Sequence, residues 1–110
     1  MRESPLFVKT YDFTKWLLEA TAKFPRNQRF VMARRIEEAI LDFYDCLLLA
    51  VKRPGERQGA LERADFELER VRHYLRLCSD MGLISLRQYE FTSQSVVEIG
   101  RLLGGWRKKG

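Results

Sequence analysis

Apolar residues recur along the chain at intervals of three and four residues, in four stretches separated by short breaks. This spacing gathers apolar side chains on one side of a helix, so it predicts helices over residues 4–24, 26–53, 60–81 and from residue 85 almost to the C-terminus. No stretch shows the sustained period-two alternation typical of a strand. Four helices joined by short loops predict an all-α, antiparallel up-down-up-down four-helix bundle, with residues 1–110 forming one domain.

The breaks carry specific turn signals. Pro54-Gly55 ends the second helical stretch, and Gly82 suits the left-handed residue that often follows the end of a helix. Ser85 and Gln88 have the spacing of a capping box and predict the start of the fourth helix. The second stretch has the clearest core stripe, which consists of Ala33, Ile36, Ile40, Phe43, Leu47 and Ala50.

The first two helices carry more apolar residues than one bundle core requires. Leu6, Phe7, Val8, Tyr11 and Leu18 extend the first stripe, and Phe30, Leu41, Tyr44, Leu48 and Val51 widen the second. A belt of this width indicates burial on a second side and therefore oligomerisation. The alternative is that these are scattered exposed apolar residues, which are common on protein surfaces.

Composition narrows the class of protein. The formal net charge is +5, which favours a phosphate-bearing or acidic partner. Cys46 and Cys78 are expected to be free core thiols in a reducing compartment. No secretory leader is recognisable, and the longest apolar run, residues 46–51, is too short to span a bilayer. We therefore expect a cytoplasmic protein with no membrane partner.

The sequence lacks the residue sets of common enzymes. His73 is the single histidine, and no His and Cys set has metal-ligand spacing. Some small helical ribonucleases have an arginine followed, after four to six intervening residues, by a histidine, but here the arginine positions hold Phe66, Glu67 and Leu68. No phosphate-binding or dinucleotide glycine motif occurs. We expect no catalytic activity, no metal and no cofactor.

Arginines stand where a helix would favour acids. The stretch FPRNQRFVMARR, residues 24–35, contains four arginines and no acid, and Pro25 suits the first turn of the helix that begins there. A cation at a helix N-terminus is unfavourable by about 0.3–1 kcal/mol, because the backbone N–H groups already make that end positive. Arg26 and Arg29 therefore indicate a functional requirement for positive charge. The structural alternative is that one of them pairs with an acid such as Asp80.

In an antiparallel bundle, several basic residues would meet at the same pole. This predicted pole cluster consists of Lys23, Arg26, Arg29, Arg72, Arg76 and Arg87. The basic C-terminal segment, residues 101–110, would lie at the other pole. A phosphate backbone fits either group, and arginine holds phosphate in a two-pronged manner that lysine cannot. Individually, these residues also fit the role of ordinary solubilising arginines, some of them paired with acids.

Four segments make the chain resemble the accessory variability determinant (Avd) family of diversity-generating retroelements. They are FPRNQRF, ADFELERVRHYLRL, LISLRQYE and EIGRLLGGW. The last, following QYE, is the most specific, and the likeness covers almost the whole chain. The resemblance implies four-helix bundles assembled into a homopentameric barrel. It also implies a non-catalytic partner of a reverse transcriptase that binds template RNA during adenine-mutagenic cDNA synthesis.

The resemblance carries contact roles onto matching residues. Arg26, Arg29, Arg72, Arg76 and Arg101 lie within the matching segments and are candidates for phosphate or polymerase contact. Arg34 and Arg35, which follow the first segment, and Arg107 and Lys108 in the basic tail complete the nine predicted contact residues. The resemblance allows two roles for Trp106, which are packing within the protein and stacking on a base. Gly100, Gly104 and Gly105 would permit close helix approach or end the helix.

Two other interpretations of the sequence stay open. One is a related bundle family encoded within intervening sequences of bacterial large-subunit ribosomal RNA genes, which resembles the chain less in the GGW ending. The other is an oligomeric scaffold that binds no nucleic acid. Salt-dependent RNA binding separates the Avd interpretation from the scaffold. A neighbouring reverse-transcriptase gene, with an adjacent pair of near-identical repeats that differ at adenines, separates Avd from the rRNA-associated family.

Overall fold

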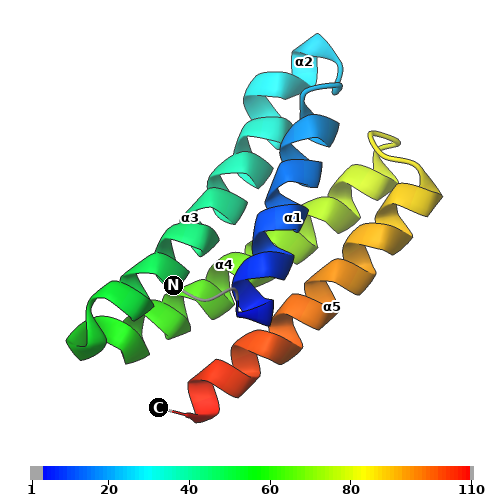
Figure 1. Cartoon of the computed structure of the whole chain (residues 1–110). Helices are drawn as coiled ribbons and strands as arrows, with labels where there is room; N and C mark the ends of the chain where they lie inside the picture. The colour runs from blue at the N-terminus through cyan, green and yellow to red at the C-terminus, as the bar shows by residue number, and fades with distance from the viewer. Residues whose placement is uncertain (1–3, 110) are drawn as a thin grey trace.

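Four long helices run antiparallel in the computed structural model, which describes residues 4–109 (Figure 1). They are α1 (Pro5–Thr21), α3 (Arg34–Lys52), α4 (Arg57–Asp80) and α5 (Leu86–Lys108). Helices α1 and α4 are diagonal, since α3 and α5 each pack against both of them. The predicted all-α four-helix bundle is confirmed, and the described residues contain no strand.

The predicted second helix is built from three pieces. A short helix, α2 (Arg26–Gln28), leads into a π-helical turn, η1 (Arg29–Ala33), which continues directly into α3. Pro25 is the N-cap residue, with φ of −55° and ψ of 150°, so it precedes the first helical residue instead of lying inside the first turn. No side chain caps α2, and no acid lies in its first turn. The sequence pattern did not predict the π-turn.

The start of α1, the start of α5 and the end of α4 follow local sequence signals. Ser4 caps α1 by accepting a hydrogen bond from the Phe7 N–H. Ser85 and Gln88 form the predicted capping box at α5. Gly82 has φ of 75°, and the N–H of Leu83 donates to the Cys78 carbonyl while that of Gly82 donates to Ser79. This is a Schellman motif, which requires a left-handed residue and therefore favours glycine.

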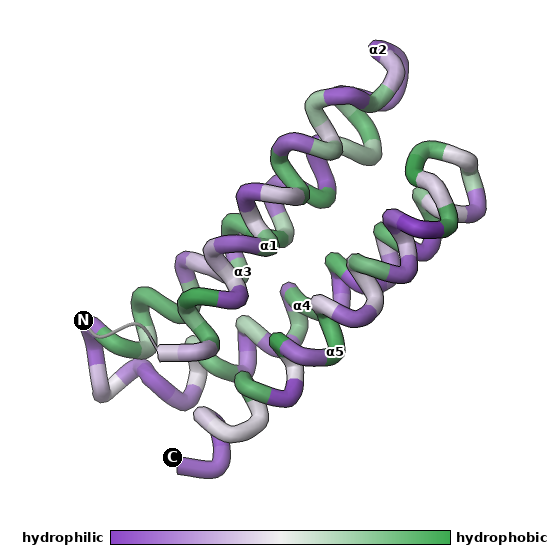
Figure 2. Tube along the Cα trace, turned by 45° about the vertical axis from the view of Figure 1, so that its right-hand side comes forward, coloured by the Kyte–Doolittle hydropathy of each residue, from purple (hydrophilic) through white to green (hydrophobic). Residues whose placement is uncertain are grey.

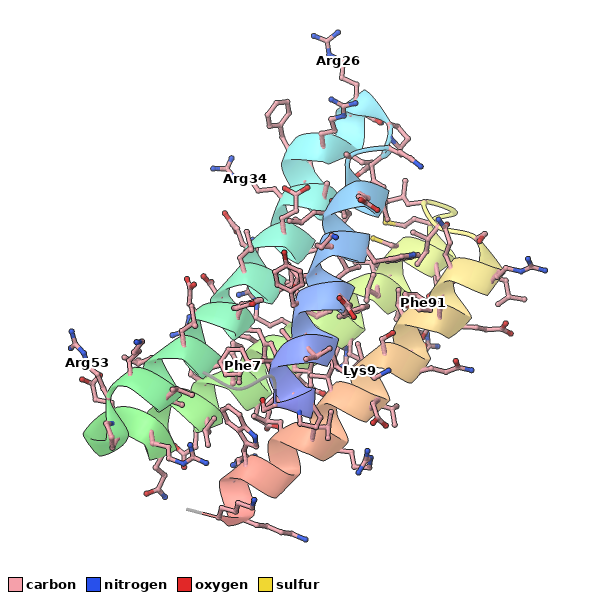
Figure 3. The ribbon with its side chains drawn as sticks, in the orientation of Figure 1. Phe7, Lys9, Arg26, Arg34, Arg53 and Phe91 are labelled. Carbon is pink, nitrogen blue, oxygen red and sulfur yellow. The ribbon has the colours of Figure 1, made fainter. Side chains whose placement is uncertain are left out.

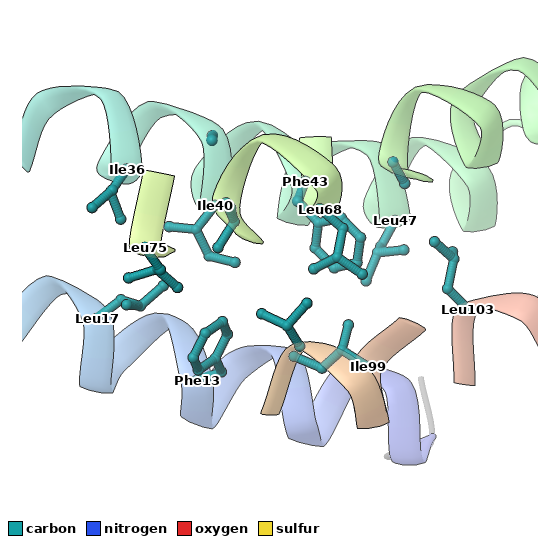
Figure 4. Packing of buried hydrophobic residues seen from close by; sticks show 14 of the residues in the cluster. Phe13, Leu17, Ile36, Ile40, Phe43, Leu47, Leu68, Leu75, Ile99 and Leu103 are labelled. Carbon is teal, nitrogen blue, oxygen red and sulfur yellow. The ribbon is translucent and has the colours of Figure 1, made fainter. Parts of the chain in front are cut away.

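The core lies along the predicted apolar stripes. Ile36, Ile40, Phe43 and Leu47 of α3 are fully buried at the centre. Figure 4 shows them facing Phe13 and Leu17 of α1, Leu68 and Leu75 of α4, and Ile99 and Leu103 of α5. Cys78 is buried and Cys46 is half-buried, and both are free thiols as predicted.

Five of the extra apolar residues of the first two helices lie on one partly exposed surface, whereas Leu6 and Phe7 are buried in the core. We call Tyr11 and Leu18 of α1, together with Leu41, Tyr44 and Leu48 of α3, the α1–α3 face. The Tyr11 and Tyr44 rings pack edge to face with centroids 6.5 Å apart, which joins the two helices. Leu41 and Leu48 remain 44% and 38% exposed, so this face is apolar and uncovered in the single chain.

Candidate nucleic-acid interface

Basic residues gather at both ends of the bundle. Figure 1 shows α2 at one end, near the α4–α5 turn, and the C-terminus at the other end. Figure 2 shows hydrophilic positions at both α2 and the C-terminal end. We call residues 24–35 with their four arginines the α2 pole, and the end that holds Arg107 and Lys108 the C-terminal pole. The predicted separation of the two basic groups is confirmed.

The strongest unneutralised charge at the α2 pole comes from Arg26 and Arg29. Both side chains are exposed, and neither has an ion pair within residues 4–109. Figure 3 shows Arg26 and Arg34 projecting from this end of the molecule, away from the bundle. Asp80 lies 3.9 Å from Arg76, measured from Oδ2 to Nε, and forms no ion pair with Arg26 or Arg29. The Asp80 alternative for these two arginines is therefore wrong.

Five of the nine predicted contact residues do have acidic partners. The nitrogen-to-oxygen distances are 3.4 Å for Arg34–Glu38, 2.5 Å for Arg72–Glu69, 3.9 Å for Arg76–Asp80, 2.6 Å for Arg101–Glu98 and 3.6 Å for Arg107–Asp65. Hydrogen bonds from the arginines hold the pKa of Glu69 and of Glu98 below the usual range. Exposed pairs of this kind are weak, so a phosphate can replace the carboxylate, but each arginine presents less net charge than Arg26 or Arg29.

Helix geometry places two members of the predicted pole cluster, Arg72 and Arg76, relative to α3. Arg35 donates a hydrogen bond of 3.4 Å to the Tyr74 hydroxyl, which places Tyr74 on the α3 side of α4. Arg72 and Arg76 are each two residues from Tyr74, so helix geometry turns them about 160–200° away from it. They therefore lie on the flank away from α3. The six-residue cluster expected from the antiparallel arrangement stays a prediction, and rotation about the axis of α4 decides which side of the pole Arg72 and Arg76 occupy.

The C-terminal pole contains a pocket of about 570 Å³ between the start of α4 and the end of α5. Arg57, Arg107 and Lys108 line it, with Glu62 as the only acid among its lining residues. Arg57 also donates to the Trp106 carbonyl at 3.1 Å, and its guanidinium lies 5.4 Å from the centroid of the Trp106 ring. The sequence pattern does not indicate Arg57 as a binding residue, because Arg57 follows the Pro-Gly break and precedes residue 60, where the third helix is predicted to begin.

Trp106 has a packing role. The centroid of its ring lies 5.6 Å from that of Phe7 in an edge-to-face arrangement, and the Arg57 guanidinium lies over the same indole ring. Of the two roles that the resemblance left open for Trp106, these contacts favour packing. Arg101 lies within α5, far along the helix from the α2 pole, and its guanidinium donates a hydrogen bond to the Glu98 carboxylate.

The chain's histidine is not part of a cleft. His73 is on the surface of α4, with Nε2 3.5 Å from a Glu69 carboxylate oxygen and a 66% exposed side chain. Within residues 4–109, no group of three or more His, Cys, Asp or Glu side chains is arranged to hold a metal ion. None of the helices formed by those residues is both long and apolar enough to cross a membrane.

Comparison with known proteins identifies the family. No curated protein matches the chain. A family model described as bAvd-like matches residues 6–110, which includes all four long helices and both basic poles. The chain therefore belongs to the bAvd-like family, as the resemblance to Avd predicted.

Proposed function

We propose that this protein is a non-catalytic accessory subunit of a diversity-generating retroelement. In this role it binds the element's reverse transcriptase and template RNA and supports mutagenic cDNA synthesis. The observation that carries the proposal is the bAvd-like match across residues 6–110. Arg26 and Arg29, which are exposed and have no ion pair within residues 4–109, support it, because they suit a phosphate backbone.

We further propose that the protein acts as a homopentamer, with the α1–α3 face buried between copies. The number five comes from the resemblance, and the apolar character of the face supports association. Assembly would also repeat each basic pole around a symmetry axis. Repetition raises the effective concentration of phosphate-binding groups along one RNA molecule, so weak individual contacts combine into tight binding.

A reconstitution tests the proposal directly. The reverse transcriptase and template RNA of the same retroelement are combined with or without this protein, and cDNA is sequenced. We expect cDNA carrying adenine-directed changes only when the protein is present, with the protein co-purifying with the enzyme. Unchanged cDNA synthesis in its absence would contradict the accessory role. Stable assembly with no salt-dependent RNA binding would instead support the scaffold interpretation.

A further inference from the structure

Phe30 is the most exposed large apolar side chain in residues 4–109, with 78% of its surface accessible. Val31 beside it is 54% exposed. Burial of a phenylalanine is favourable by about 1.5–3 kcal/mol, so folding alone gives no reason to leave this ring in water. The exposed ring lies at the α2 pole, within the turn that departs from regular α-helix.

Phe30 points outward from within the π-turn. Met32 and Ala33 lie four and three residues before Ile36, so they continue the buried stripe of α3, while Phe30 and Val31 face solvent. Single π-turns within α-helices occur frequently at functional sites.

Cations flank the exposed ring on its own face of the helix. Arg26 lies four residues before Phe30 and Arg34 four residues after it, a spacing that brings side chains to one face. Each is displaced along the helix axis by about 6 Å from the ring. Arg29 is adjacent, and no acid occurs between residues 24 and 36. The arrangement is an aromatic ring between two arginines, of which Arg34 is also paired with Glu38 and Arg26 has no ion pair within residues 4–109.

We propose that Phe30 is a stacking platform for an unpaired RNA base, with Arg26 and Arg34 holding the phosphates on either side. The inference rests on the proposed RNA-binding function and specifies single-stranded RNA as the ligand of the α2 pole. Base stacking on an aromatic ring with neighbouring cations is how proteins hold single strands. Charge favours RNA over a two-fold contact with a second copy, because two copies meeting symmetrically through this surface would bring the same arginines together.

The test compares Phe30→Leu with the wild-type protein. Leucine keeps an apolar side chain but removes the ring. The probes are a fluorescein-labelled single-stranded RNA and a perfectly paired RNA duplex of equal length, titrated by anisotropy at several salt concentrations. We expect Phe30→Leu to lose about five-fold or more in affinity for the single strand at every salt concentration. The salt slope should stay the same, since no phosphate contact is removed, and duplex affinity should stay within about two-fold.

Two further variants sharpen the result. Phe30→Trp retains an aromatic face and should bind the single strand at least as well as the wild type. Phe66→Leu is the matched control, because Phe66 is 58% exposed on α4, away from the arginines of the α2 pole. It should leave both affinities unchanged.

Each contrary outcome has a distinct meaning. If wild type binds RNA and Phe30→Leu binds the single strand equally well, the stacking platform is wrong and the proposed function stands. If the wild type binds neither RNA, both proposals are wrong. If Phe30→Leu keeps its RNA affinity but reduces the oligomer mass or the retention of reverse transcriptase, the exposed ring belongs to a protein interface and the platform is wrong.

Discussion

Arg70 Nη1 lies 2.7 Å from Glu67 Oε1, and the Glu67 side chain is fully buried. Arg63 Nε meets the other carboxylate oxygen, also at 2.7 Å. The Arg70 guanidinium lies 5.6 Å from the centroid of the Tyr74 ring, and Tyr74 accepts a hydrogen bond from Arg35 of α3. Both oxygens of a buried carboxylate are therefore satisfied by charged donors, and the network joins α4 to α3.

Removing the buried carboxylate should strongly destabilise the protein. Glu67→Ala leaves Arg70, whose side chain is only 20% exposed, without its charge partner. We expect a loss of about 2–4 kcal/mol in the free energy of unfolding, below the upper limit for a buried pair because Arg63 can reach water. Urea denaturation at a fixed protein concentration measures this value.

Glu69→Ala is the matched control for Glu67→Ala. Glu69 also pairs with an arginine three residues along α4, but its side chain is 54% exposed. Exposed pairs contribute little, so the loss should stay below about 1 kcal/mol. Equal destabilisation by the two variants would show that burial does not determine the strength of the Glu67 network.

Thiol ionisation should make stability fall at high pH. Burial raises the pKa of Cys78 from 9.0 to about 11. Between those two pH values the unfolded chain loses this proton while the folded chain keeps it, so ionisation favours unfolding. The free energy of unfolding should therefore decrease from about pH 9 to about pH 11. Cys78→Ala should lack that part of the decrease, and a pH dependence identical to that of wild type would contradict the assignment.

Thiol labelling gives an independent check of the same burial. At pH 8, Cys46, which is half-buried, should react slowly with a disulfide reagent, because burial raises the pKa of its thiol as well. In Cys46→Ser the remaining thiol, Cys78, should react only as the protein unfolds. Rapid labelling of Cys46→Ser under native conditions would show that the core around Cys78 opens readily.

Charge on the α1–α3 face should prevent assembly without unfolding the bundle. In the double variant Leu41→Glu, Leu48→Glu, both substituted positions are partly exposed, so the single chain tolerates them. Like charges would then be desolvated between copies, which is strongly unfavourable. Light scattering should give a mass several times 13.0 kDa for wild type and close to 13.0 kDa for the variant, with helical circular dichroism retained.

Val97→Glu is the control for that experiment. Val97 is 70% exposed on α5, outside the α1–α3 face, so this variant should keep the wild-type mass. A monomeric wild-type protein at micromolar concentration would contradict the assembly proposal. A multimeric double variant would show that the copies meet through another surface.

Local sequence signals predicted the four long helices and some of their ends, because each signal acts within a few residues. Where no capping signal stands, the prediction was less accurate: α4 begins at Arg57 and not at residue 60. The Ser85–Gln88 capping box and the left-handed Gly82 are examples. The π-turn was not predictable in this way, because no local signal distinguishes it from regular α-helix. A continuous helix would have satisfied the spacing equally well.

The interface was only partly predictable, for a similar reason. Arg26 and Arg29 could be identified from charge and position. The side of the bundle on which Arg72 and Arg76 lie, however, depends on how α4 is rotated against α3. Glu67 was missed because glutamate is rarely buried. Its position between Ala64 and Val71 of the α4 stripe, with Arg63 and Arg70 at helical spacing, was the signal that pointed to a buried carboxylate.

The central claim is that Arg26 and Arg29 stand at an unfavourable helix end because RNA or polymerase binding requires charge there. The double variant Arg26→Gln, Arg29→Gln removes two cations that have no ion pair within residues 4–109. Its stability should rise by up to about 1 kcal/mol or stay level. Arg72→Gln, Arg101→Gln is the control, since both of its arginines are paired with acids and should contribute less to binding.

The most direct measurement is a salt titration of RNA affinity combined with thermal melting of the same samples. We predict that Arg26→Gln, Arg29→Gln binds RNA more weakly by about 1 kcal/mol or more, and that its log affinity against log salt is flatter by about one to two units. Its melting temperature should equal or exceed that of the wild type. A lower melting temperature with unchanged RNA affinity and salt slope in the folded protein would contradict the account.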